Sequence, residues 1–391
     1  MAVLVILVLG CYPAATWCEQ ATARRFETLS KQAEAARLAG RPDQAILLYR
    51  EAVAANPHWL KGWENLGVLL ADRGNYAAAR EAFRKIVEAQ PDNGDGWALL
   101  GLSEFHLARY QQAVGHLERA RSLRIATPGL ARLVQYHSAL CMILLEDFDT
   151  AHGLLRLLYR NGVESNELIE ALGLAALRIA ALPGQEPEAA RPLVMSLGRL
   201  VLRSFHQPVA QIRTEFESLI ARHPDRPGLR YAYGNYLAGK ALYEEACEAF
   251  RQELQNSPQH ALARLQIAAI KLRTNQTEEA QPWAEEAVKL VPLSFAGHLV
   301  LGRILLKRGE TDRAITELET AAKLAPQSIH VHYSLLTAYQ KAGRQIEATR
   351  EQSALKRLQE YEARLKVQTA DAYPDQSHDV EPSVDTHRVP R

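Results

Sequence analysis

The sequence predicts an all-α solenoid in which helix–turn–helix units stack side by side. Two observations lead to this prediction. Small and aromatic residues recur at helix-pair spacings within Leu60–Asn93, and prolines recur every 34 residues in two separate parts of the chain. A single helix pair leaves one apolar face uncovered, so a unit of this kind needs neighbours of the same kind.

The stretch Leu60–Asn93 shows the pattern most fully. Trp63, Leu66 and Gly67 fall on one face of the first expected helix, because offsets of three and four residues bring side chains round to the same side. We expect Gly67 to be the point at which the second helix, Tyr76–Ala89, comes closest. Phe83 on that second helix would then fill the space beside the glycine.

The prolines give the period. Pro57 and Pro91 are 34 residues apart, and the same interval separates four later prolines: Pro224, Pro258, Pro292 and Pro326. Because proline stops a helix, each one marks the end of a unit's second helix.

These motifs resemble the tetratricopeptide repeat, with Trp63-x2-Leu66-Gly67, then Ala79-x3-Phe83, then Pro91. Seven units can be recognised. The resemblance implies a right-handed superhelical solenoid and a role in binding a protein or peptide. It does not identify the partner, because this repeat serves many unrelated tasks.

The repeat pattern divides the chain into an N-terminal array at 26–127, degenerate helical units at 128–226, and a C-terminal array with a capping helix at 227–368. A polar tail, 369–391, is expected to be disordered. In the middle region we expect helices at about Asn166–Ala181, Ala189–Ser204 and Val209–Arg222. The proline-rich break at Leu182–Pro187 separates the first two.

The N-terminus predicts export. Ala2–Leu9 is an apolar run that is too short to span a bilayer, so residues 1–18 are interpreted as a signal peptide. Val8–Cys11 resembles a lipobox, in which Cys11 would be lipidated. Cleavage near Cys18 and a buried N-terminal helix are the alternatives. We therefore expect a periplasmic protein or a membrane-anchored lipoprotein, with a cytoplasmic protein as the remaining possibility.

Composition and motifs argue against several function classes. With 46 Lys+Arg against 45 Asp+Glu, the chain lacks the basic excess that holds nucleic-acid phosphates. No nucleotide-binding, metalloprotease or hydrolase signature is present, so neither a cofactor nor a metal is expected. Cys141 and Cys247 are expected to be buried in helices. These observations favour a protein without enzymatic activity.

The predicted binding surface is the concave face, which the first helix of each unit lines in this family. In the C-terminal array these positions form a mainly apolar stripe that is interrupted by a few polar residues. Such a stripe would be costly if left uncovered, so we expect a peptide to lie on it. Close superhelical packing that covers the leucines is the alternative. The residues predicted to contact the partner are Tyr231, Asn235, Leu265, Leu299, Arg303, His330 and Tyr333.

Two other functions stay open. One is a membrane-tethered assembly factor, which a lipidated Cys11 would favour. The other is an enzyme subunit that uses the irregular middle, Arg160–Arg222. That region offers scattered Glu and Arg and a single His206, whereas an active site needs clustered titratable groups.

Overall fold

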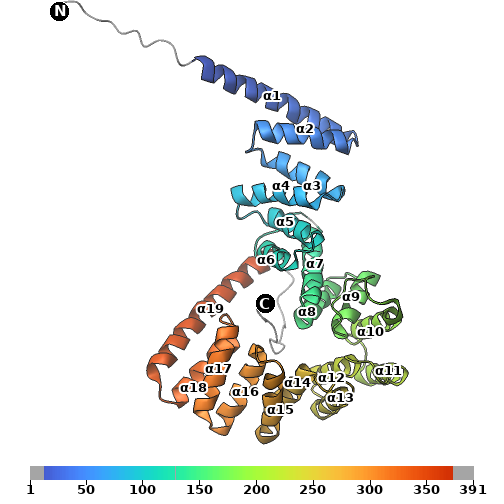
Figure 1. Ribbon diagram of the computed structural model, residues 1–391, viewed down its shortest axis with the longest axis vertical. Coiled ribbons are helices and arrows are strands. Elements are labelled where there is room, and N and C mark those ends of the chain that lie inside the picture. The colour runs from blue at the N-terminus through green and yellow to red at the C-terminus, as the bar shows by residue number, and fades with distance from the viewer. Residues whose placement is uncertain (1–12, 128, 373–391) are drawn as a thin grey trace, which may run out of the picture. The chain divides into compact units, whose positions relative to one another are not determined.

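The computed structural model describes residues 13–127 and 129–372, and every regular element in these ranges is helical (Figure 1). Nineteen α-helices and one short 3-10 helix occur there, and no strand does. The predicted all-α fold class is confirmed. The helices belong to two compact units that divide between Val134 and Gln135.

The first unit contains three antiparallel helix pairs, each joined by a short turn. Their bounds are α1 Pro13–Leu38, α2 Pro42–Ala55, α3 Leu60–Asp72, α4 Tyr76–Ala89, α5 Gly94–His106 and α6 Tyr110–Arg121. A Cβ placed on Gly67 would lie 2.5 Å from the Phe83 ring, and one on Gly101 would lie 2.8 Å from Leu117. Glycines therefore stand where α3 meets α4 and where α5 meets α6, as predicted.

The division between the units falls within α7, Leu130–Leu144. The helices that follow are α8 Phe148–Arg160, α9 Asn166–Ala176, α10 Arg191–Arg203, α11 Val209–Arg222, α12 Leu229–Gly239, α13 Tyr243–Asn256, α14 Ala261–Arg273, α15 Thr277–Leu290, α16 Phe295–Arg308, α17 Thr311–Leu324, α18 Ile329–Lys341 and α19 Gln345–Ala372. Glu188–Ala190 forms the 3-10 helix η1. From α12 onward the helices again pair in order.

The turn inside each pair uses a left-handed residue. In the first unit Gly40, Gly74 and Ala108 take positive φ at intervals of 34 residues. In the second unit the series is Ala241, Asn275, Gly309 and Gly343. The backbone conformation repeats even where glycine does not, so alanine and asparagine accept a conformation that costs an L-residue free energy.

A side-chain hydrogen bond ties several of the first helices to the proline before them. In the first unit Trp63 Nε1 donates to the Pro57 carbonyl and Trp97 Nε1 to the Pro91 carbonyl, both at 2.9 Å. In the second unit Nε2 of His332 lies 2.9 Å from the Pro326 carbonyl. Donor and proline are six residues apart in each case, so different side chains perform one structural task.

The middle region contains a close helix contact. A Cβ on Gly173 would lie 2.0 Å from the Val194 carbonyl oxygen, and one on Gly198 would lie 1.9 Å from that of Ile169. The backbones of α9 and α10 therefore touch directly. Helix α9 ends at Ala176, earlier than the predicted Ala181.

The terminal helix α19 reaches Ala372, beyond the predicted end at residue 368, so the first four residues assigned to the tail are helical. The rest of that tail lies outside the described residues. Arg350, Lys356 and Arg357 on α19 are exposed. Charged side chains suit a helix that no other described repeat covers.

Candidate partner-binding surfaces

The residues predicted to contact a partner do not share one environment. Arg303, His330 and Tyr333 are exposed and Asn235 is half-buried. The other three, Tyr231, Leu265 and Leu299, are buried. They all lie on the first helices of the C-terminal array, which are α12, α14, α16 and α18.

The expected exposed leucine stripe is absent. Leu265 and Leu299 are each only 4% exposed and belong to one core cluster built from α14 to α19. Helix α16 contacts both α14 and α18, so the apolar side chains of successive first helices cover one another. The prediction that these two leucines meet a partner directly is wrong for this conformation. Close packing, the alternative interpretation, explains their burial.

Tyr231 is also a core residue. Its ring stacks on His260 with 4.6 Å between centroids and lies 5.5 Å from the ring of Phe250. The Arg178 guanidinium stands over the tyrosine ring at 5.5 Å. Burial, with the nearby charge of Arg178, lowers the pKa of His260 to about 4. The neutral imidazole Nδ1 accepts a hydrogen bond from the Ala263 amide at 3.2 Å and so caps α14.

Tyr333 instead lines an open groove between α18 and α19. The ring is 65% exposed, and the groove has a volume of about 470 Å³. Leu336 and Leu355 supply its apolar base. The α19 wall is polar and carries Thr349, Gln352, Ser353, Lys356 and Gln359.

The preceding repeat shows what normally fills such a groove. Tyr333 lies 34 residues after Leu299, and Gln352 lies 34 residues after Leu318, which is fully buried. Helix α18 packs on both α16 and α17 and covers these positions. The α18–α19 groove is therefore the place that a following first helix would occupy.

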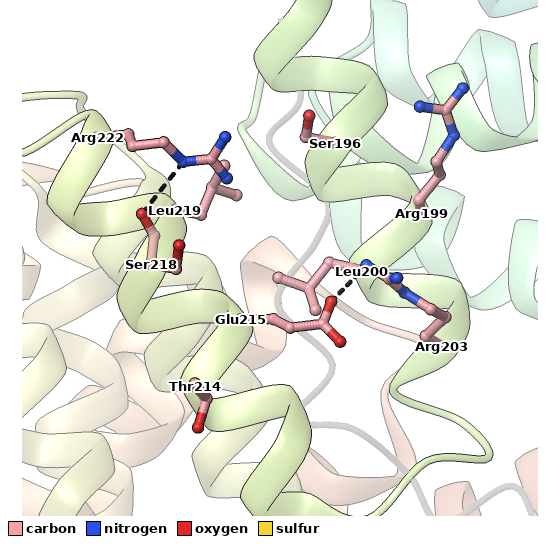
Figure 2. A pocket seen from close by; sticks show the side chains of 9 residues that line it. All are labelled: Ser196, Arg199, Leu200, Arg203, Thr214, Glu215, Ser218, Leu219 and Arg222. Atoms are coloured by element: carbon pink, nitrogen blue, oxygen red, sulfur yellow. Dashed lines mark hydrogen bonds and ion pairs between the residues drawn. The ribbon is translucent and has the colours of Figure 1, made fainter.

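A second cavity, of about 440 Å³, lies between α10 and α11. Figure 2 shows Arg203 of α10 reaching toward Glu215 of α11, with which it forms an ion pair. Arg222 extends from α11 toward α10, and its Nε donates to the Ser218 carbonyl at 3.3 Å. The remaining lining residues are Ser196, Arg199, Leu200, Thr214 and Leu219.

The repeat architecture is matched by a known family. A sequence profile described as Tetratricopeptide repeat matches residues 30–94, 64–131, 213–261 and 265–329, which together make up more than half of the chain. The chain belongs to the tetratricopeptide repeat family.

One curated relative matches a short stretch of this chain. Superkiller complex protein 3 of Mus musculus is 29% identical over 111 residues, which are 28% of this chain and 7% of that protein. This chain thus spans a small fraction of that relative's length. The similarity suggests no more than a shared repeat.

Two solved structures are also similar to this chain. Yeast Tom70 is 14% identical, with 91% of this chain and 89% of that chain covered and a TM-score of 0.37. MamA from Desulfovibrio magneticus RS-1 is 21% identical over 39% of this chain and 85% of that chain, with a TM-score of 0.35. At these identities the likeness concerns the fold alone.

Possible metal ligands and nucleophiles can be located within the described residues. Within residues 13–127 and 129–372 no three His, Cys, Asp or Glu side chains are arranged to hold a metal ion. Cys141 and Cys247 are buried, as predicted, and burial raises the pKa of the Cys141 thiol to about 12. A thiol with so high a pKa is a poor nucleophile.

One buried acidic pair lies in the middle region. Glu170 and Glu186 are both buried, and Arg191 approaches them at 3.5 and 3.6 Å. The Gly184 amide donates to Glu170 at 2.9 Å, which ties the loop before η1 to α9. Burial raises the pKa of Glu170. We interpret the pair as a device that holds this loop in place.

The N-terminal predictions fall largely outside the described structure. Cys11, the candidate lipidation site, lies among residues 1–12, and α1 begins at Pro13. None of the described helices combines the length and the apolar run that a bilayer crossing needs.

Proposed function

We propose that this chain is a non-enzymatic scaffold that holds a segment of a partner protein on its C-terminal repeats. Tetratricopeptide repeat proteins generally bind protein partners, and membership of that family supports this role. The partner segment would be an amphipathic helix bound in the α18–α19 groove. The proposal requires no cofactor, metal or nucleic acid.

The exposure of Tyr333 is the observation on which the proposal depends. Its counterpart Leu299 is covered by the next first helix, whereas Tyr333 remains 65% exposed. A partner helix placed in the groove would cover Tyr333 and Leu336 in the way that α18 covers α16. Tyrosine suits this role because its ring gives a large contact area at a low cost in side-chain entropy, and binding hot spots are enriched in it.

Three other residues predicted to contact the partner are at least partly exposed. Arg303 on α16 and His330 on α18 are exposed, and Asn235 on α12 is half-buried. We propose that Arg303 and His330 contact the partner beside Tyr333, and that Asn235, three first helices earlier, contacts only a partner segment that extends beyond the groove. The three buried residues would then act indirectly, as core residues that hold the first helices in place. They are Tyr231, Leu265 and Leu299.

A defined peptide can test this proposal. Peptides would be selected from a random library against the full chain, and their affinity would be measured for the wild type and for Tyr333→Ala. We expect selected peptides with apolar residues at i, i+3 and i+4, and a loss of affinity of about 30-fold in the variant, the size of a typical hot spot.

Leu38→Ala is the matched control, because Leu38 is 72% exposed in the first unit and should leave binding unchanged. Equal affinity of the wild type and Tyr333→Ala for every selected peptide would exclude the groove.

We further propose that the chain is exported, either with a cleaved signal segment or with a lipid on Cys11. In the lipidated form it would act as a membrane-tethered assembly factor. The short apolar run Ala2–Leu9 and the lipobox-like Val8–Cys11 support this. Mass spectrometry of the mature N-terminus tests it: a diacylated Cys11 would support tethering, and an intact Met1 would contradict export.

A further inference from the structure

We infer that the α10–α11 cavity is a second binding site, which takes an acidic segment of a partner protein. The site is separate from the α18–α19 groove and does not depend on it. Helix α10 presents Ser196, Arg199, Leu200 and Arg203 to the cavity, at offsets of three, four and seven residues. This spacing keeps one face of the helix turned toward α11.

The cavity carries an excess of positive charge. Its lining includes three arginines and one carboxylate, Glu215. Glu215 is paired with Arg203. Among the described residues, neither Arg199 nor Arg222 has a carboxylate partner. Both guanidinium groups stay available to a ligand: Arg222 extends from α11 toward α10, whereas Arg199 extends from the side of α10 that is turned away from α11 in Figure 2.

Arginine provides most of the donors for an anion. The Ser196 hydroxyl donates to the Pro192 carbonyl at 2.7 Å, and the Thr214 hydroxyl donates to that of Ala210 at 3.1 Å. Their protons are already used within their own helices. The guanidinium group offers a planar fork of N–H donors that matches a carboxylate with two hydrogen bonds.

The position of Glu215 favours several spaced carboxylates over one compact anion. Figure 2 shows Glu215 between the two helices, so a small dianion at the centre would meet its negative charge. An acidic peptide can instead place one carboxylate near Arg199 and another near Arg222. Leu200 and Leu219 also line the cavity, but they are only 2% and 3% exposed and offer a peptide little apolar contact, so the exposed polar side chains would carry the binding.

The sequence around the cavity is more positively charged than the chain as a whole. Residues 191–222 contain five arginines, no lysine and two glutamates, whereas the complete chain has a net charge of +1. The chain as a whole also favours arginine over lysine, so the local feature is the excess of positive charge, which suits an acidic ligand.

Fluorescence anisotropy with the full chain tests the inference. The probe is a fluorescein-labelled 12-residue peptide rich in Asp and Glu, and the control is the same peptide with Asn and Gln. We expect binding of the acidic peptide alone, a loss of at least 10-fold on Arg199→Ala/Arg222→Ala, and a smaller loss on Arg222→Lys. Binding should also weaken as salt is raised.

Arg350→Ala is the matched control, since Arg350 is exposed on α19, far along the chain from this cavity. Circular dichroism would verify that each variant is folded. Tyr333→Ala should bind the acidic peptide normally, so failure of the groove and failure of this site can be told apart. Equal binding of the neutral peptide, or unchanged affinity of the double variant, would overturn the inference. So would a preference for inorganic phosphate or for phosphatidylserine vesicles over the peptide.

Discussion

Leu299 and Tyr333 hold the same position in successive repeats, and only Leu299 is covered. Leu299 is 4% exposed beneath α18, whereas Tyr333 is 65% exposed beside α19, the last described helix. The two residues therefore show the difference between a position that a following first helix covers and the same position in the last described repeat. The same comparison separates core residues from candidate contact residues.

Acidic substitution at these two positions should have opposite consequences for stability. Leu299→Glu buries a carboxylate that has no partner and should lower the free energy of unfolding by about 3 kcal/mol or more. Tyr333→Glu should change it by no more than about 0.5 kcal/mol. Urea denaturation followed by circular dichroism measures both values. Similar values for the two variants would show that Leu299 is not a core residue.

The α9–α10 crossing should not tolerate a methyl group. Gly198→Ala would place Cβ 1.9 Å from the Ile169 carbonyl oxygen, and backbone cannot move aside as a side-chain tip can. We expect a loss of about 1–3 kcal/mol in the free energy of unfolding. Gly153→Ala in α8 is the control, because its Cβ would meet open space and alanine favours helix by about 0.5–1 kcal/mol. A stabilising Gly198→Ala would rule out the close crossing.

The left-handed turn between α5 and α6 offers a stabilising change. Ala108 has φ of +56°, a conformation that glycine takes without a steric cost. Ala108→Gly should raise the free energy of unfolding by about 0.5–1 kcal/mol. The same change at exposed, helical Ala35 should lower it by a similar amount. Thermal melts should show a higher melting temperature for Ala108→Gly and a lower one for Ala35→Gly. A lower melting temperature for both variants would contradict the turn geometry.

His260 should make the protein less stable in acid. Burial beside Arg178 lowers its pKa to about 4, below the unfolded value of about 6.5. A group whose pKa is lowered in this way favours its neutral form in the fold. The stability that His260 gives the folded state is therefore fully present above pH 6.5 and is lost as the pH falls toward 4.

The non-titrating variant His260→Asn provides the comparison. Asparagine keeps a capping acceptor at the start of α14 but cannot take up the proton. Unfolding measured between pH 4 and 8 should show a smaller acid loss for the variant than for the wild type. Parallel curves would mean that His260 titrates normally in the folded protein.

Helix bounds could be predicted where the sequence carries a local stop or start signal. Helix α4 spans Tyr76–Ala89 as predicted, because the Asn75 side chain caps it by accepting from the Ala78 amide. Pro91 follows its end. Helix α9 was predicted too long, since Arg178 takes φ of +56° and the sequence has no glycine there to signal a turn.

The exposure of the predicted contact residues could not be predicted from the sequence. Periodicity identifies the inward face of a helix but does not show whether another helix covers that face. Leu265 was placed on the correct face, yet whether the neighbouring first helix covers that face depends on how closely successive repeats pack. The α10–α11 cavity was missed for a related reason. The arginine excess at 191–222 was visible in the sequence, but whether Arg199 and Arg222 line one cavity depends on how α10 and α11 pack.

Hydrogen exchange of the full chain, with and without a selected peptide, tests the central claim most directly. The account predicts slower exchange on peptide binding in two segments, the start of α18 around Tyr333 and the part of α19 from Thr349 to Gln359. Exchange elsewhere in the C-terminal repeats should change little. Slower exchange centred on α12 and α14, with no change at Tyr333, would contradict the account. It would show that the peptide binds on those two helices and not in the α18–α19 groove.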